Sequence, residues 1–208
     1  MTKSRPMSVV ELIYEWIVKQ QLEKLSESRD PRVIYVTDLV ACTHKFHMRK
    51  SFPELGISFE PSAVLGDIAH IGLGKLLSEK GFSVEVEVSR EIEIENVKYL
   101  LKGRVDALSV DKGVVVEVKT SKSAVGLPRE HHVKQLKIYL ELLGAKHGVL
   151  VYITPDKLVE YHYDYEPVDL EAEVRALLAN TQHPRYPWEC GYCTYRKLCP
   201  YAQLAKGD

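Results

Sequence analysis

The sequence lacks the features that would place it in a membrane or give it an overall attraction for nucleic acid. Its longest apolar runs fall far short of the roughly 20 residues that a membrane helix needs. Its first residues contain no apolar signal core, so we expect a cytoplasmic protein. The net charge is −1 over 208 residues, so any DNA binding must come from a local basic patch.

The sequence also contains no internal repeat, no low-complexity tract and no phosphate-binding G-x4-G-K motif. Gly74-Lys75 would complete that motif only with a glycine at position 69, where the chain has Ala69. Because this glycine-rich loop cradles the phosphates of a bound nucleotide, the chain is not expected to be a nucleotide-driven motor. A hydrophobic fraction of 45% suits one globular domain.

Cysteine is scarce and unevenly distributed. An intracellular chain with four cysteines is expected to use them for a metal site rather than for disulfides. Cys190 and Cys193 form a C-x2-C pair, Cys199 follows with Pro200 behind it, and Cys42 stands alone. Structural zinc commonly takes four thiolates, and so do iron–sulfur clusters. The spacing alone leaves both metals open.

The periodicity of apolar residues predicts an α/β (mixed α+β) fold, with a central mixed sheet flanked by helices. Ser8 and Thr37 are the expected N-caps of the first two helices. Residues 53–61, 121–129 and the chain from Pro184 onward are expected to be loops. The predicted helices are 8–25, 38–50, 62–80, 130–143 and 170–179, and the predicted strands are 83–96, 99–108, 114–118, 148–154 and 159–165.

One predicted hairpin carries the residues that most suggest chemistry. Asp106 closes the apolar run 99–108, and Glu117 and Lys119 close the run that follows the turn at 111–113. Side chains two residues apart on a strand share a face, so Glu117 and Lys119 point the same way. Alone, this acid and this lysine could be an ordinary surface pair.

Two carboxylates beside an amine suit the hydrolysis of a phosphodiester. That reaction needs charge neutralised on the phosphate and a deprotonated water in line, and one or two divalent metals provide both. Mg²⁺ or Mn²⁺ would take oxygen ligands, here the carboxylates of Asp106 and Glu117 and the backbone carbonyl of Val118. Lys119 would orient the water and screen the developing charge.

Two predicted helices could complete this site. His70 lies on the helix before the sheet, and its imidazole could bind the metal. Gln135 and Tyr139 are spaced i and i+4, so they share one face of the helix 130–143. Both could hydrogen-bond DNA or the catalytic lysine.

These residues stand in the order of a known set of motifs. The elements are His70, Gly-Arg-Val-Asp-Ala at 103–107, Glu-Val-Lys-Thr at 117–120, and a glutamine and a tyrosine at 135 and 139. They resemble the motifs of RecB-type nucleases, in the restriction-endonuclease-like D…E-x-K superfamily. The resemblance implies one nuclease domain over residues 1–208 with a core at about 62–165. It implies that the catalytic residues are Lys119, Glu117, Asp106, Gln135 and Tyr139.

One early cysteine and three late ones resemble, within that superfamily, the CRISPR-associated exonucleases with an iron–sulfur cluster. The resemblance implies an iron–sulfur subdomain from about 37–60 and 166–208, with [4Fe–4S] favoured and [2Fe–2S] the alternative. It implies a 5′ to 3′ exonuclease on single-stranded DNA, which could also cleave endonucleolytically. Its implied role is to process DNA for spacer acquisition beside CRISPR integrase subunits. The cluster ligands would be Cys42, Cys190, Cys193 and Cys199.

Basic residues flank the proposed site. Residues 119–137 contain five Lys or Arg against one Glu, and residues 44–50 form a second basic run. Basic side chains on phosphates would give salt-sensitive, sequence-independent binding. Trp188, Tyr192 or Tyr195 could stack on unpaired bases. The expected phosphate contacts are Lys122, Arg129, Lys134, Lys45 and Arg49.

Two other functions fit the sequence. One is a RecB-type repair nuclease outside CRISPR. The other is a non-catalytic DNA-binding subunit with a structural zinc or iron–sulfur site, against which the intact set of two acids and a lysine argues. The sequence predicts no membrane partner and leaves self-association open.

Overall fold

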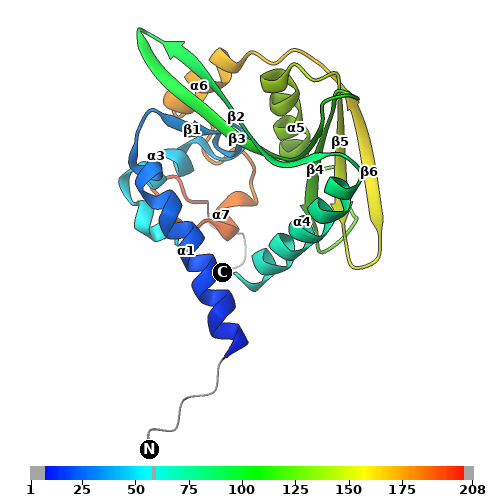
Figure 1. Ribbon diagram of the computed structural model, residues 1–208. Helices are drawn as coiled ribbons and strands as arrows, with labels where there is room; N and C mark the ends of the chain where they lie inside the picture. The colour runs from blue at the N-terminus through cyan, green and yellow to red at the C-terminus, as the bar shows by residue number, and fades with distance from the viewer. Residues whose placement is uncertain (1–7, 58–59, 204–208) are drawn as a thin grey trace, which may run out of the picture.

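The computed structural model of the chain describes residues 8–57 and 60–203, arranged around one mixed β-sheet (Figure 1). Among these residues, no helix is long and apolar enough to span a membrane. The strands are β1 (Val33–Tyr35), β2 (Ser83–Ile94), β3 (Val97–Ser109), β4 (Val114–Thr120), β5 (His147–Ile153) and β6 (Leu158–Asp164). The helices are α1 (Val9–Arg29), α2 (Val36–Leu39), α3 (Thr43–Ser51), α4 (Pro61–Glu79), α5 (Glu130–Leu143), α6 (Leu170–Leu178) and α7 (Glu189–Tyr192).

The sheet runs in the order β1-β3-β4-β5-β6, with β2 paired to β3. β1 is parallel to β3 and β4 is parallel to β5, while the remaining pairs are antiparallel. The chain passes from β4 to β5 through α5, because two adjacent parallel strands need a crossover connection. The predicted mixed sheet flanked by helices is confirmed.

β2 and β3 form a long hairpin that reaches beyond the other strands (Figure 1). Its turn lies at Glu95 and Asn96, whose φ angles of 52° and 65° are the left-handed pair that a type I′ turn requires. Ile92 and Ile94 of β2 are buried, whereas the glutamates that alternate with them are exposed. The acidic face predicted for residues 83–96 is confirmed, and it belongs to one continuous strand.

Each face of the sheet has its own apolar core. α5 covers one face with buried Leu136, Ile138 and Leu140. It lies so close that a Cβ on Gly148 of β5 would come within 2.9 Å of the Leu136 side chain. α4 covers a smaller cluster on the other face, formed by Ala107, Val116 and Val118 with partly buried neighbours. β4 is therefore enclosed on both faces from Val115 to Val118, and Glu117, the polar side chain within that stretch, is buried with it.

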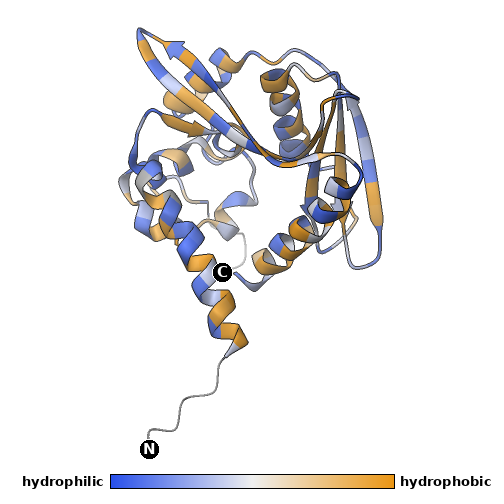
Figure 2. Ribbon diagram, viewed as in Figure 1, coloured by the Kyte–Doolittle hydropathy of each residue, from blue (hydrophilic) through white to orange (hydrophobic). Residues whose placement is uncertain are grey.

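The outer side of α4 remains apolar. Leu65, Ile68 and Ile71 are each more than half exposed, and much of the helix is coloured as hydrophobic in Figure 2. The first turn of α1 is similar, with Val9 and Val10 about two-thirds exposed. These two helices carry much of the large apolar surface that the described residues leave in contact with solvent.

The helix predicted at 38–50 is two helices, and Thr37 is not an N-cap. α2 begins earlier, where the Asp38 carboxylate accepts the Tyr35 backbone N–H at 2.8 Å. The helix then ends because residues distant in the sequence form hydrogen bonds with the backbone groups of Ala41 and Cys42. Ala41 O accepts from the Arg185 side chain, and Cys42 N donates to the Glu189 carboxylate. Cys42 is the N-cap residue from which α3 starts.

Other local predictions differ in smaller ways. The Ser8 cap is confirmed, since its hydroxyl accepts from the Glu11 N–H, but α1 continues to Arg29. The loop predicted at 53–61 contains a 3-10 helix, η1 (Pro53–Gly56), and residues 58–59 of that loop lie outside the described residues. The tail beyond Pro184 contains the short helix α7.

Candidate active site and cysteine site

The sheet opens beside Asp106. β3 and β4 pair for only three residues, ending with Ala107 opposite Val116. Continuing the ladder would bring Val118 opposite Val105, but the Asp106 Oδ2 atom accepts the Val118 N–H at 2.6 Å instead. Beyond this point Val105 belongs to the core under α5, while Ala107 belongs to the core under α4. The Asp106 carboxylate therefore lies between β3 and β4, at the point where their pairing ends.

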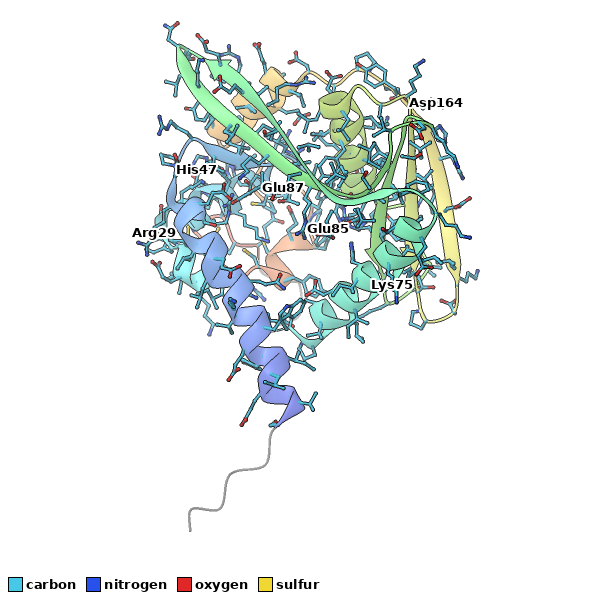
Figure 3. The ribbon with its side chains drawn as sticks, viewed as in Figure 1. Arg29, His47, Lys75, Glu85, Glu87 and Asp164 are labelled. Atoms are coloured by element: carbon cyan, nitrogen blue, oxygen red, sulfur yellow. The ribbon has the colours of Figure 1, made fainter. Side chains whose placement is uncertain are left out.

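The neighbouring strand, β2, has a strained backbone residue at the position opposite Asp106. Glu85 of β2, labelled in Figure 3, lies between the pairs Val84–Ala107 and Val86–Val105, so its place in the register is opposite Asp106. Its φ of 53° is in the left-handed region that side-chain-bearing residues rarely adopt. The strained residue therefore sits where β3 changes the face to which its side chains point.

Glu117 lies beneath α5 with 2% of its surface exposed. Its Oε1 atom accepts from Lys119 Nζ at 2.7 Å and from Gln135 Nε2 at 2.9 Å. Its Oε2 atom is buried with no hydrogen-bond partner among the described residues. Burial raises the pKa of Glu117 to about 7, against the opposing effect of Lys119. Burying a carboxylate oxygen without a hydrogen-bond partner costs free energy, unless a donor or a cation binds it.

Gln135 and Tyr139 approach Glu117 from α5. The Tyr139 hydroxyl lies 3.3 Å from Gln135 Nε2, and burial raises its pKa, so it remains protonated. The Tyr139 ring lies against Gly103, where a Cβ would come within 2.5 Å of the ring and 2.9 Å of Val36. Because Gly103 has no side chain, the Tyr139 ring can lie against its backbone at the site. This contact explains why the first residue of the Gly-Arg-Val-Asp segment is glycine.

His70 reaches Asp106 from α4 on the other face of the sheet. Its Nδ1 atom lies 3.1 Å from Asp106 Oδ1, and the two side chains are 27% and 17% exposed. This hydrogen bond raises the pKa of His70 above its ordinary value, against the opposing effect of burial. The histidine faces solvent more than Glu117 does, so it lies nearer the open side of the site.

The structure brings together every side chain that the sequence assigned to catalysis. One chain of hydrogen bonds joins Tyr139, Gln135, Glu117 and Lys119. Asp106 binds His70 and also accepts the N–H of Val118, the residue between Glu117 and Lys119, so the pair lies next to that chain. Among the described residues, no three His, Cys, Asp or Glu side chains converge closely enough to hold a single metal ion. Glu117 instead engages Lys119 and Gln135.

The comparisons with known proteins agree with this geometry. Residues 73–200 match the PD-(D/E)XK nuclease superfamily, a span that includes the two acids, the lysine and three cysteines. The chain belongs to that superfamily and is a nuclease. The match begins three residues after His70 and does not include Cys42. A D…E-x-K nuclease core, which the resemblance implied, is confirmed.

Similar proteins cover nearly the whole of this nuclease. The CRISPR-associated exonuclease Cas4 of Saccharolobus solfataricus is 44% identical over 200 residues, 91% of this chain and 98% of the relative. The crystal structure of a protein designated SSO0001 has a TM-score of 0.85 at 41% identity, covering 92% of this chain and 98% of that one. An alkaline exonuclease from Laribacter hongkongensis shares the fold alone, with a TM-score of 0.51 at 15% identity over 74% of this chain and 91% of that chain.

The four cysteines of the nuclease line one cavity. Its volume is about 130 Å³, and all four thiols are free. Cys42 caps α3, Cys190 lies in α7, Cys193 follows α7, and Cys199 lies in the segment beyond. Burial raises the pKa of the Cys42 and Cys199 thiols. Chain segments about 150 residues apart therefore present their sulfur atoms to a shared space.

Hydrogen bonds hold these segments together without the thiols. The Glu189 carboxylate accepts from Cys42 N at 2.7 Å with one oxygen and from Tyr186 N at 2.8 Å with the other. The Thr43 N–H and hydroxyl both donate to the Gln182 carbonyl, and the Thr43 hydroxyl accepts from the Gln182 N–H. Sequence reasoning missed Glu189, although its position directly before Cys190 was an available signal.

The predicted phosphate contacts fall into two groups. Lys122, Arg129 and Lys45 are exposed and available to a ligand. Lys134 pairs with Glu173, and Arg49 pairs with Asp38 at 2.5 Å and lies over the Tyr35 ring. Because its guanidinium is largely enclosed, Arg49 has an internal structural role, and the structure offers no support for it as a phosphate contact.

Proposed function

We propose that this nuclease hydrolyses single-stranded DNA with Mg²⁺ or Mn²⁺ bound by Asp106, Glu117, the Val118 carbonyl and His70. The observation that carries the proposal is Glu117 Oε2, which is buried and has no hydrogen-bond partner in the described part of the chain; the neighbouring Val118 N–H binds the Asp106 carboxylate. Nucleases of this superfamily use divalent metals, and hard carboxylate oxygens with one imidazole suit such cations. A bound metal would neutralise phosphate charge and lower the pKa of its water.

The surrounding residues have separate tasks in this proposal. Gln135 holds Glu117 Oε1 and so orients the free oxygen. Lys119 hydrogen-bonds the same oxygen and carries the positive charge that would face the attacking water and the phosphate. The Val118 N–H fixes the Asp106 carboxylate, and the protonated Tyr139 hydroxyl keeps Gln135 in position.

Four cysteine thiolates can hold either a zinc ion or an iron–sulfur cluster. The four cysteines of this chain line one cavity of about 130 Å³. The arrangement of one early and three late cysteines resembles that of the iron–sulfur nucleases, which favours the cluster. We propose that Cys42, Cys190, Cys193 and Cys199 hold the cluster, [4Fe–4S] in preference to [2Fe–2S]. The cluster would join the N- and C-terminal segments as one subdomain.

The biological role follows by similarity to the Cas4 relative. We propose a 5′ to 3′ exonuclease activity that processes DNA for CRISPR spacer acquisition together with integrase subunits. Identity of 44% across 91% of the chain supports this role over a repair nuclease outside CRISPR. The apolar surfaces of α1 and α4 support a further proposal that the chain associates with itself or with those subunits.

The nuclease proposal is tested with purified protein on labelled single-stranded oligonucleotides. Cleavage should need Mg²⁺ or Mn²⁺ and stop with a chelator, and 5′- and 3′-blocked substrates should give the direction. Cleavage of duplex but not single strands would overturn the proposed substrate, and chelator-resistant cleavage would overturn the metal assignment.

The cluster proposal has a separate test. The purified protein should be brown and contain iron and acid-labile sulfide, and replacement of Cys190 or Cys193 by serine should remove the colour. A colourless protein with one bound zinc would overturn it.

A further inference from the structure

Three aromatic rings gather beside the active site, and none of them belongs to the catalytic chain. The Tyr186 and Trp188 rings are stacked, with centroids 5.9 Å apart and planes 11° apart. His131, from the first turn of α5, lies 5.1 Å from Trp188 and 5.6 Å from Tyr186. We refer to these three residues as the aromatic platform.

Trp188 is not a core residue. It is 48% exposed, and His131 and Tyr186 are partly exposed. An indole in the core would be covered by apolar neighbours, because burying it is favourable by several kcal/mol. Here one large ring and its two aromatic neighbours remain accessible, which is the arrangement that proteins use to receive a flat ligand ring.

A short path of contacts connects the platform to the catalytic lysine. Lys119 of β4 is the strand partner of Tyr152 on β5. The Tyr152 hydroxyl bonds to His132 Nδ1 at 2.9 Å and accepts the Arg129 N–H at 2.9 Å. His132 in turn lies against His131, with ring centroids 4.1 Å apart. Burial lowers the pKa of both histidines, and the positive charge of Lys119 adds to that effect.

The cysteine segment fixes the position of the platform. Glu189 accepts the Tyr186 N–H with one oxygen and the Cys42 N–H with the other. Trp188 also lines the cysteine cavity. Tyr186 forms one wall of an open polar groove of about 610 Å³, whose other lining residues include Lys134, Arg185 and Glu130. The groove carries both signs of charge, so the rings rather than the groove are suited to grip a ligand.

We propose that His131, Tyr186 and Trp188 form a subsite that stacks an unpaired nucleobase next to the phosphate that is cleaved. In a duplex each base is already covered above and below by its neighbours, so only an unpaired base presents a free face to the rings. The subsite therefore selects single strands, and the groove beside Tyr186 gives the strand room to continue. This inference rests on the proposed nuclease function, which it supplements with a determinant of specificity.

Binding is measured in an Asp106→Asn background, so that the oligonucleotide is not degraded. Trp188→Ala should weaken binding of a single-stranded oligonucleotide roughly 5- to 100-fold, the effect of losing one base–aromatic contact. Phe52→Ala is the matched control, because Phe52 is an aromatic that is 45% exposed, close to the 48% of Trp188, and lies outside the platform. Trp188→Phe retains a ring and should recover most of the affinity. Equal affinity of the Trp188→Ala and Phe52→Ala variants would overturn the subsite.

A stacking role and a folding role are separated with abasic oligonucleotides. The Asp106→Asn protein should lose affinity sharply when the base is missing at one position of the strand. In the Trp188→Ala variant the same abasic substitution should have no further effect. Equal sensitivity of both proteins at every position would overturn the proposal even if Trp188→Ala reduced stability.

Fluorescence gives an independent readout. The chain has two tryptophans, Trp16 and Trp188, so Trp16→Phe leaves Trp188 as the reporter. Single-stranded oligonucleotide should quench its emission with the concentration dependence of binding, and unquenched emission at saturation would contradict stacking. Failure of the wild-type protein to bind single strands would overturn both the subsite and the proposed substrate. A protein that cleaves single strands with metal, but in which Trp188→Ala does not change the effect of the abasic substitution, would overturn the subsite alone.

Discussion

The Asp106 carboxylate accepts the backbone N–H of Val118 at 2.6 Å, at the level where Val105 would otherwise continue the β-ladder. This single contact has two consequences. It fixes one acid at the opening between β3 and β4, and it gives the Val118 N–H the acceptor that a continued ladder would have supplied. The Asp106 side chain thus takes the place of a strand partner, and the edge of β4 that it leaves unpaired from β3 is the proposed active site.

The first prediction concerns the acids and the lysine. Asp106→Ala, Glu117→Ala and Lys119→Ala should each reduce metal-dependent cleavage by at least about 100-fold, because each removes a proposed metal ligand or the charge proposed to face the phosphate. Initial rates on a single-stranded oligonucleotide measure the effect, and circular dichroism checks the fold. Glu93→Gln, an exposed acid on the distal part of β2, is the control. Full activity in all three variants would refute the site.

The second prediction concerns the pH dependence of cleavage. Because burial raises the pKa of Glu117 to about 7, the carboxyl is protonated below neutral pH and must lose that proton to bind a cation. Cleavage at limiting Mn²⁺ should therefore fall as the pH drops through about 7, and higher Mn²⁺ should move the midpoint to lower pH. A midpoint independent of metal concentration would show that another group controls the profile.

The third prediction concerns stability without metal. The folded pKa of Glu117 is raised above the value of 4.5 expected in the unfolded chain. Its contribution to stability is therefore fully present below pH 4.5 and is lost as the pH rises through about 7. In the presence of chelator, Glu117→Gln should unfold at a higher temperature than the wild type at pH 8. The difference should shrink at pH 5, and a difference of the same size at both pH values would contradict the assigned pKa.

The fourth prediction tests the contact between Gly103 and Tyr139. A Cβ at residue 103 would lie 2.5 Å from the Tyr139 ring, so Gly103→Ala should cost about 1–3 kcal/mol and displace Gln135 with Tyr139. Gly74→Ala in α4 is the control, because within the described structure the added Cβ would meet nothing within 4 Å beyond its chain neighbours and its own helix backbone, and alanine is the better helix former. Thermal melts of both variants measure the effect, and equal stability would rule out the close contact.

The fifth prediction concerns Glu189. Glu189→Ala removes the acceptor shared by Cys42 N and Tyr186 N, and two charge-assisted bonds should together contribute about 3 kcal/mol or more. The variant should lose its visible absorption faster than the wild type when a chelator is added, and it should melt at a lower temperature. Glu23→Ala, an exposed residue of α1, is the control. Unchanged rates of loss would show that the cysteine segments hold together without Glu189.

Local patterns predicted several elements well because their causes are local. The alternation in β2 follows from burial of one side of a strand, and Gly144, with its φ of 61°, ends α5 as a left-handed cap does. The region 36–51 was harder to predict. Its helical pattern is interrupted by bonds to Arg185 and Glu189, more than 140 residues away, and no local signal reports such partners.

The sequence by itself determined the chemistry that this nuclease can perform. Residue types and their order supplied two acids, a lysine, a helical histidine, a Gln–Tyr pair and four thiols, because chemical identity and spacing along one strand or helix are local properties. Tertiary structure alone decided how those groups behave. Only the packing of α5 onto β4 buries Glu117 and leaves its Oε2 atom without a hydrogen-bond partner among residues 8–57 and 60–203. Only the approach of two distant segments gathers the cysteines and sets Trp188 beside His131. Burial and the absence of a hydrogen-bond partner depend on neighbours that are remote in sequence, and these determine a pKa or a binding surface.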